Sequence, residues 1–257
     1  MNRTKIEWCD YTVNPVKGKC PVGCEYCYMW GKHGIGMRFH FDQRIRYDAS
    51  AWLGVGSLRK PSRIFVGSTI ELFHPRTEKY LKYIFMEVEQ SLRETPQHTF
   101  IFLTKQPQNL IKFSPFPDNC YVGVTATGLQ MFNKAMFNLQ KVEASVKYIS
   151  FEPLLEELQM CSSWLTLFGK PIIDWLIIGQ QTLVSAKTEP KIEWIREIVE
   201  AADKAGIPVF LKDNLKPLII TEGYPYQVGV GPLIVSIGDS RTYKLRQEMP
   251  REVMALV

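Results

Sequence analysis

The segment RIFVGS, residues 63–68, is a short and almost continuously apolar run that ends on small residues. Five further runs of the same kind follow it: TFIFLT at 99–104, YVGVT at 121–125, KYISF at 147–151, DWLIIG at 174–179 and PVFLK at 208–212. Such runs are typical of parallel strands that are covered on both faces. Residues 6–10 are a candidate for one more strand, at the start of the sheet.

Amphipathic segments separate these runs. Between the first two runs, apolar residues recur at helical spacing: Leu81, Ile84, Phe85, Val88 and Leu92. Before the last run the pattern returns and is closed by Gly206 and Pro208: Ile192, Ile195, Val199 and Ala202. Strands that alternate with helices predict βα units with right-handed crossovers.

Polar residues follow nearly every predicted strand. They are Ser68, Thr69, Thr104, Lys105, Thr125, Glu152, Gln180, Gln181, Lys212 and Asp213. A (β/α) barrel brings all such ends to one mouth, whereas an open doubly wound sheet spreads them along an edge and uses one switch point. Because so many ends are polar, we expect an α/β fold that forms a partial (β/α) TIM-like barrel, with the open sheet as the alternative.

The chain has no Ser/Gly/Pro-rich linker, so one domain over residues 1–257 is expected. Its barrel core spans about 4–215, and a C-terminal extension spans about 216–257, where 232–237 is a candidate extra strand. Residues 31–60 read as a long loop followed by a helix or an irregular segment.

The composition, 46% hydrophobic and 22% charged residues, excludes disorder as the main state. The longest apolar runs are far shorter than the roughly 20 residues that cross a bilayer. Because the N-terminus is polar and lacks the apolar stretch of a secretory signal, we expect a cytoplasmic protein with reduced thiols and no membrane partner. The net charge of +5 permits an anionic partner without requiring one.

Three of the six cysteines, Cys20, Cys24 and Cys27, are spaced C-x3-C-x2-C. In a reducing compartment such crowding favours metal binding over disulfides. Three thiolates can hold three corners of an iron–sulfur cubane and leave one iron open. A structural zinc would need a fourth ligand, for which Cys9 and His33 are the nearest candidates.

The other cysteines form no second close group, so an additional cluster is not expected. Cys120 and Cys161 are predicted to be buried and to act as small apolar residues. His74 is either a polar group at the mouth or a hydrogen-bonded structural residue. Asn14, followed by Pro15, is expected to shape the loop that leads to the cysteines.

Cys20, Cys24, Tyr26 and Cys27 match the C-x3-C-x-aromatic-C motif, so the sequence resembles the radical S-adenosylmethionine superfamily. The stretch IEWCDYTVNP at 6–15 is similar to the opening of the phage Gp37/Gp68-like (DUF5131-type) family. Looser similarity extends over most of residues 4–215, through LFH at 72–74, FLTK at 102–105, GVT at 123–125, SFEPL at 150–154 and IIG at 177–179. The chain differs from many members in a shorter spacing between its first two cysteines, and in Gln180 and Gln181 after the strand predicted at 174–179.

The resemblance implies a [4Fe-4S] cluster whose open iron binds S-adenosylmethionine. Reductive cleavage would then give a 5'-deoxyadenosyl radical that abstracts hydrogen from an unknown substrate. It also implies a reductant protein of flavodoxin or ferredoxin type. The alternative is a non-catalytic binding protein whose cysteines hold a structural zinc or iron–sulfur site.

The resemblance also implies cofactor contacts near the cysteines. Tyr26 either lies against the adenine or packs the loop. Gly67, Ser68 and Thr69 fall where the superfamily often contacts the methionyl amino group. Glu71 either supplies an anion there or is a solvated carboxylate at the start of a helix.

Two later strand ends complete the implied site. Thr125 and Glu152 are candidates for contacts to the ribose or to a substrate hydroxyl. If Glu152 is buried it requires a partner, and Lys105 and Lys212 are the obvious ones.

The loop after the cysteines combines cations with stacking surfaces: Arg38, Phe39, His40, Phe41, Arg44, Arg46 and Tyr47. This mixture is compatible with a nucleotide or nucleic acid as partner. A solvated loop with no ligand is the other interpretation.

Overall fold

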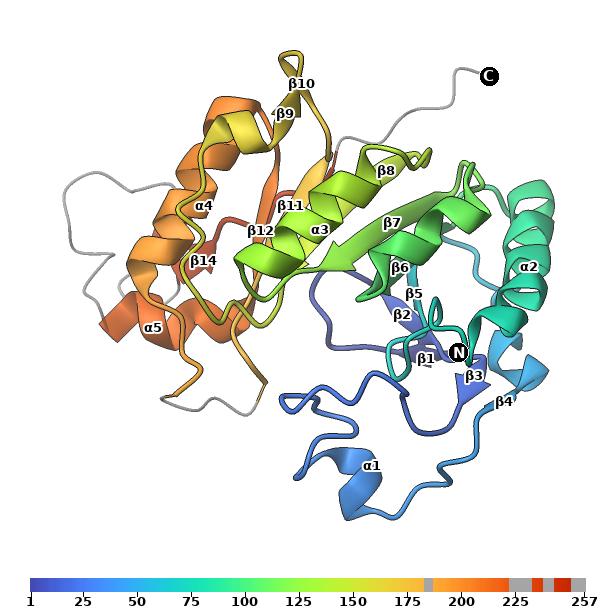
Figure 1. Ribbon diagram of the computed structural model, residues 1–257. Helices are drawn as coiled ribbons and strands as arrows, with labels where there is room; N and C mark the ends of the chain where they lie inside the picture. The colour runs from blue at the N-terminus through green and yellow to red at the C-terminus, as the bar shows by residue number, and fades with distance from the viewer. Residues whose placement is uncertain (183–186, 222–232, 238–242, 251–257) are drawn as a thin grey trace. The chain divides into compact units, whose positions relative to one another are not determined.

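A computed structural model describes residues 1–182, 187–221, 233–237 and 243–250 (Figure 1). The chain forms two compact units. The first unit contains residues 1–124 and 141–145, and the second contains residues 125–140 and 146–257. The expected single domain over 1–257 stays a prediction.

The first unit is built on an open sheet in the order β1-β2-β5-β6-β7. Its strands are β1 (Asn2–Arg3), β2 (Tyr11–Val13), β5 (Arg63–Val66), β6 (Thr99–Thr104) and β7 (Cys120–Thr125), which ends at the boundary of the unit. β1 is antiparallel to β2, and the others run parallel. A separate antiparallel pair joins β3 (Val16–Lys17) to β4 (Arg46–Tyr47).

Helix α2 (Leu81–Glu94) lies in the crossover between β5 and β6. Its apolar residues repeat every three or four positions, so one face of the helix is buried. Leu81, Ile84 and Val88 are fully buried, and the predicted helix is confirmed. The remaining helical segments of the unit are short: α1 (Ile35–Arg38) and the 3-10 helices Ala49–Trp52, Glu78–Tyr80 and Pro107–Phe113.

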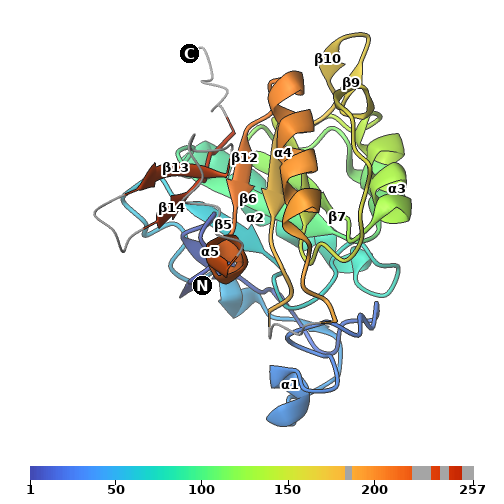
Figure 2. The same cartoon turned by 90° about the vertical axis from the view of Figure 1, so that its left-hand side faces the viewer.

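The second unit contains the parallel strands β8 (Val146–Phe151), β11 (Trp175–Ile178) and β12 (Val209–Leu211), in that order. Its helices are α3 (Leu129–Leu139), α4 (Ile192–Ala205) and α5 (Lys216–Thr221), with 3-10 turns at Ser162–Trp164 and Asp213–Leu215. Figure 2 shows α4 running alongside β12. The predicted end of α4 is confirmed, because Gly206 adopts the left-handed conformation (φ 70°) that caps helices.

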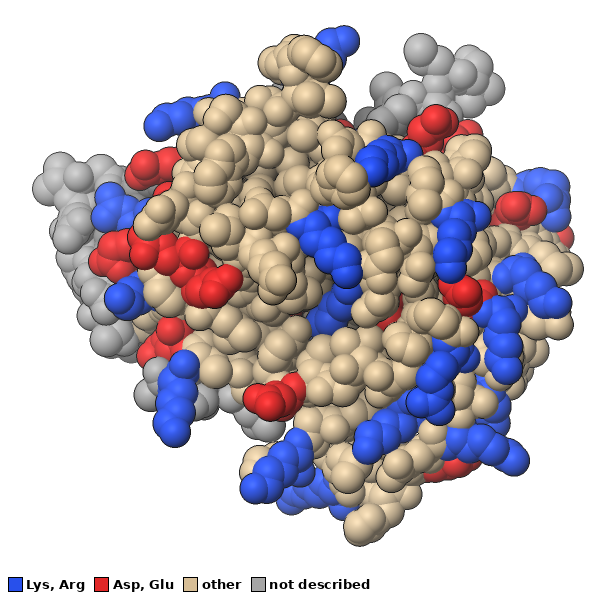
Figure 3. Space-filling view, in the orientation of Figure 1, with Lys and Arg blue, Asp and Glu red and all other residues tan. Residues whose placement is uncertain are grey.

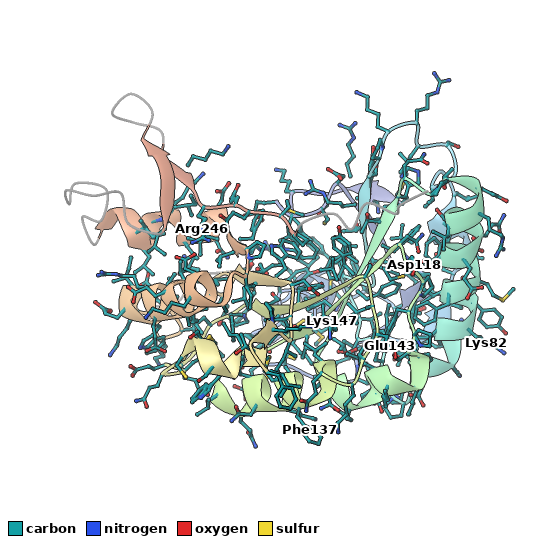
Figure 4. The ribbon with its side chains drawn as sticks, turned by 90° about the horizontal axis from the view of Figure 1, so that it is seen from above. Lys82, Asp118, Phe137, Glu143, Lys147 and Arg246 are labelled. Carbon is teal, nitrogen blue, oxygen red and sulfur yellow. The ribbon has the colours of Figure 1, made fainter. Side chains whose placement is uncertain are left out.

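Among its described residues the second unit also contains two antiparallel strand pairs. They are β9 (Thr166–Leu167) with β10 (Lys170–Pro171), and β13 (Ile234–Ile237) with β14 (Tyr243–Leu245). The expected extra strand is therefore confirmed over 234–237, while residue 232 lies outside the described residues. Arg246, labelled in Figure 4, forms ion pairs of 2.7 Å with Asp203 and Glu248 and so fastens the segment after β14 to α4.

All six predicted strands from residue 63 onward are confirmed, but the first strand is not at 6–10. Residues 6–9 form a turn closed by the Cys9 N–H donating to the Ile6 carbonyl (3.2 Å), and the strand starts at Tyr11. The apolar character of Trp8 and Cys9 reflects burial of this turn.

The prediction for Cys120 is confirmed, since it is buried in β7, but the prediction for Cys161 is wrong. Cys161 is exposed because it precedes a short 3-10 helix and contacts the Ser163 hydroxyl (3.0 Å) instead of a core.

The α/β class with mainly parallel strands is confirmed. Within each unit the described strands form an open sheet, so the expected barrel is not confirmed. No helix among the described residues is long and apolar enough to span a membrane.

Candidate functional site

The three clustered cysteines lie in one loop between β3 and α1, which we call the cysteine loop (residues 19–31). All three are half-buried. The Cys27 N–H donates to the Cys24 carbonyl (3.1 Å), which closes a turn between the last two thiols. The sulfur of Cys27 accepts the Trp30 N–H (3.2 Å), and the sulfur of Cys20 accepts the Glu71 N–H (3.4 Å). Two of the thiols are thus already oriented by backbone donors.

A tight return of the backbone follows Cys27 and depends on glycine. The Gly31 N–H donates to the Cys27 carbonyl (2.8 Å). A Cβ at Gly31 would lie 2.6 Å from that same carbonyl oxygen, closer than any side chain tolerates. Only glycine lets the loop fold back on itself directly after its third cysteine.

The cysteine loop is attached to the carboxyl end of β5. The Tyr28 hydroxyl donates to the Ser68 carbonyl (2.8 Å). The side-chain carbonyl of Asn14, just after β2, accepts from the Ser68 hydroxyl (3.1 Å) and from the Thr69 N–H (3.3 Å). Asn14 therefore shapes the end of β5 beside the cysteine loop. Gly67, which directly follows β5, has a positive φ of 80°.

Glu71 is buried, with 7% of its surface exposed, so the solvated alternative for this carboxylate is wrong. One oxygen accepts from the Thr104 hydroxyl (2.6 Å) and the Phe73 N–H (3.0 Å). The other accepts from the Lys105 N–H (2.7 Å). Because its own N–H reaches Cys20, Glu71 connects the cysteine loop to the end of β6.

Tyr26 lies between the cysteines and β6. Burial and a hydrogen bond with Cys24 raise the pKa of its phenol. The Lys105 ammonium lies 5.9 Å from the centre of its ring. Burial also raises the pKa of the Cys20 thiol, opposed in part by the N–H groups of Val22 and Glu71. A metal bound there would have to displace the thiol proton.

The described residues contain no group of three or more His, Cys, Asp or Glu side chains placed to hold a metal ion. A zinc ion needs its sulfur ligands about 2.3 Å from one point. An iron–sulfur cluster instead places each thiolate on a different iron. The donor set fits such a cluster in kind, since it offers three thiols on one loop with N–H donors to two sulfurs. Of the candidate fourth zinc ligands, Cys9 is buried in the 6–9 turn and His33 is exposed.

The second unit carries Thr125 and Glu152. Thr125 is almost fully buried at the end of β7. Glu152 follows β8 and forms an ion pair with Lys212, which follows β12; their side chains are 21% and 11% exposed. The expected partner Lys212 is thus confirmed.

Sequence reasoning missed Asn214, which lies in the short 3-10 helix after β12. Its side chain accepts from the Gln180 N–H (3.3 Å) and donates to the Gln180 carbonyl (2.8 Å). Within the part of the chain that the structure describes, the buried Oε1 atoms of Gln180 and Gln181 have no hydrogen-bond partner. The signal available was an amide residue shortly after a predicted strand, whereas the prediction for Asn14 rests on the proline that follows it.

His74 is a hydrogen-bonded turn residue, so the prediction of a structural role is confirmed. Its Nδ1 accepts the Arg76 N–H (3.1 Å), and its carbonyl accepts the Thr77 and Glu78 N–H groups (2.8 Å each). These bonds shape the entry to α2.

The fold and this loop define an α/β protein with a three-cysteine loop attached to the end of a parallel strand. Residues 3–216 match the family model described as "Protein of unknown function (DUF5131)", and the chain belongs to this family. The DUF5131-type resemblance is confirmed, while the expected core of about 4–215 stays a prediction. Searches of the curated proteins and of the solved structures found no match.

Proposed function

We propose that this protein is a radical S-adenosylmethionine enzyme, with its parallel strands in the partial (β/α) barrel of that superfamily. Cys20, Cys24 and Cys27 would hold a [4Fe-4S] cluster. The observation that carries the proposal is the combination of the C-x3-C-x2-C spacing with the attachment of that loop to the end of β5. A merely structural metal would not require a strand end beside it.

Held by Cys20, Cys24 and Cys27, such a cluster would supply the electron for reductive cleavage of the S–C5' bond of S-adenosylmethionine to methionine and a 5'-deoxyadenosyl radical. Backbone N–H groups donate to the sulfurs of Cys20 and Cys27 and so orient both side chains on the loop. Tyr26 offers an aromatic surface beside the thiols for the adenine.

The strand end would orient the methionyl part of the cofactor. Ser68 and Thr69 are half-buried, and their hydroxyls are held by Asn14 (3.1 and 3.4 Å). Glu71 acts as a positioning residue, because its carboxylate oxygens already accept three donors. Thr125 and Glu152 remain proposed contacts to ribose or substrate hydroxyls.

Anaerobic purification and reconstitution with iron and sulfide test the cluster. We expect brown protein with broad absorbance near about 400 nm and about four irons per chain. Cys24→Ala should lose both. Cys161→Ala is the matched control, because this cysteine is exposed and lies in the second unit. Colourless protein with one tightly held zinc would instead support the non-catalytic alternative.

Activity is tested by incubating the reconstituted protein with S-adenosylmethionine and dithionite. We expect 5'-deoxyadenosine and methionine, and none from Cys24→Ala. A flavodoxin- or ferredoxin-type protein should replace dithionite as the reductant. A cluster that is reduced without any cleavage would refute the proposed chemistry.

A further inference from the structure

The residues that follow the cysteine loop form a cationic and aromatic segment, which we call the arm (residues 32–46). It carries four Lys or Arg residues and one carboxylate, Asp42. Phe39 and Phe41 are 62% and 45% exposed. Single exposed apolar residues are ordinary, but two adjacent exposed phenyl rings among cations form a distinct surface.

The two rings are arranged as a platform. Phe39 and Phe41 stack with centroids 6.4 Å apart and planes 29° from parallel. The Arg38 guanidinium lies 5.6 Å from the centre of the Phe39 ring. Cation, ring and ring therefore form one continuous stacking surface.

Backbone hydrogen bonds give the arm a defined shape, unlike a solvated loop. The Phe41 N–H donates to the Gly36 carbonyl (2.9 Å), and the Phe39 N–H donates to the Ile35 carbonyl (3.0 Å). The Ile35 N–H donates to the Tyr28 carbonyl (2.9 Å), which joins the arm to the cysteine loop. The platform thus has a fixed backbone next to the cysteines.

The charge of the arm is only partly neutralised. Arg46 is paired with Asp42 at 2.6 Å. Arg38 and Arg44 are exposed and form no ion pair within the described part of the chain, and Lys32 is exposed as well. In Figure 3, Lys and Arg side chains gather over the region of the first unit that carries α1, with few carboxylates among them.

We propose that the arm binds single-stranded nucleic acid. Unpaired bases would stack on Phe39 and Phe41, and phosphates would contact Arg38, Arg44 and Lys32, since stacking platforms flanked by cations are how proteins hold single strands. A duplex hides the faces of its bases and cannot use the rings. The proposed binding does not depend on the proposed radical chemistry. Only the idea that the arm brings a substrate to the cysteine loop rests on the proposed function.

The test is fluorescence anisotropy of a labelled oligothymidylate of about 16 nucleotides with the full-length chain, at several salt concentrations. Phe39→Ala and Phe41→Ala should each weaken binding by between about fivefold and a hundredfold. Arg38→Ala with Arg44→Ala should make the slope of log K against log salt shallower by about 0.7 per arginine.

Phe168→Ala and Lys170→Ala are the matched controls. Phe168 is 96% exposed and Lys170 is exposed, both in the β9–β10 hairpin of the second unit. These variants should bind like the unmodified chain. If they weaken binding as much as the arm variants do, the effect is not specific to the arm and the proposal is wrong.

Three other outcomes overturn the proposal: no binding of the oligothymidylate, tighter binding of a duplex of the same length, or binding only to vesicles of phosphatidylserine and phosphatidylcholine. The last would make the arm a membrane-surface element. Anisotropy detects binding and not cofactor cleavage. A negative binding result therefore does not contradict the proposed radical chemistry, and a negative cleavage assay does not contradict nucleic-acid binding by the arm.

Discussion

Glu71 in the first unit and Glu152 in the second are both carboxylates that follow parallel strands, yet they are held in different ways. Glu71 accepts two backbone N–H groups and one hydroxyl. Glu152 is paired with the ammonium of Lys212. A carboxylate held by backbone donors fixes the shape of the chain around it, whereas one held by a lysine depends on a single movable side chain. The first unit thus carries the more rigid strand end.

The largest expected effect comes from Glu71→Ala. It leaves three donors around the site unpaired, so we expect the free energy of unfolding to fall by about 4 kcal/mol. Urea unfolding monitored by circular dichroism measures this. Glu71→Gln, which keeps one acceptor oxygen, should lose less. Equal losses for the two variants would show that the donors find other partners.

Lys212→Met should cost about 3 kcal/mol, because it leaves the mostly buried Glu152 carboxylate uncompensated. Adding Glu152→Gln should recover much of that loss, since the unpaired charge is then gone. The double-mutant cycle in urea measures the coupling. Additive losses would mean that the two groups do not interact, and the contrast with Glu71 would disappear.

Gly67 and Gly179 allow a matched comparison of the strand ends themselves. A Cβ at Gly67 would meet the Leu72 side chain at 2.6 Å, on a backbone with φ of 80°. A Cβ at Gly179 would meet the flexible Lys212 side chain at 3.0 Å. We expect Gly67→Ala to lower the free energy of unfolding by about 2 kcal/mol and Gly179→Ala by less than about 1 kcal/mol. The reverse order of the two losses would contradict the rigid first strand end.

The smallest expected losses of stability come from replacing the two asparagines. Asn14→Ala removes the acceptor for Ser68 and Thr69, and Asn214→Ala removes the pair with Gln180. Each should cost about 1 kcal/mol in thermal or urea unfolding. Asn14→Asp keeps an acceptor oxygen and should restore most of the first loss, whereas Asn214→Asp lacks the amide donor and should not restore the second.

Much of the framework followed from local sequence. The six predicted strands are continuous apolar runs, and such runs have few other uses in an α/β chain. The first strand was misplaced because Trp8 and Cys9 are buried in a turn, and burial alone does not distinguish a turn from a strand. The predicted burial of Cys161 is wrong because its surroundings depend on a short 3-10 helix that has no clear pattern in the sequence.

The site was predictable where it depended on spacing or on opposite charge. The three cysteines lie on one loop, and Lys212 was a natural partner for Glu152 because the two have opposite charges and both stand at the ends of predicted strands. The donors to Glu71 were not foreseen. Their contact depends on how the turn after β5 lies against the end of β6, a relation between segments more than thirty residues apart.

Glu71 couples the Cys20 thiol to the backbone at the end of β6. Its amide is bound to the Cys20 sulfur while its carboxylate receives the amide of Lys105. An event that displaces that sulfur must therefore alter the protection of an amide just after a different strand, β6. Deuterium uptake at position 105 becomes a remote reporter of whatever occupies the thiols, readable without any spectroscopic signal from the occupant itself.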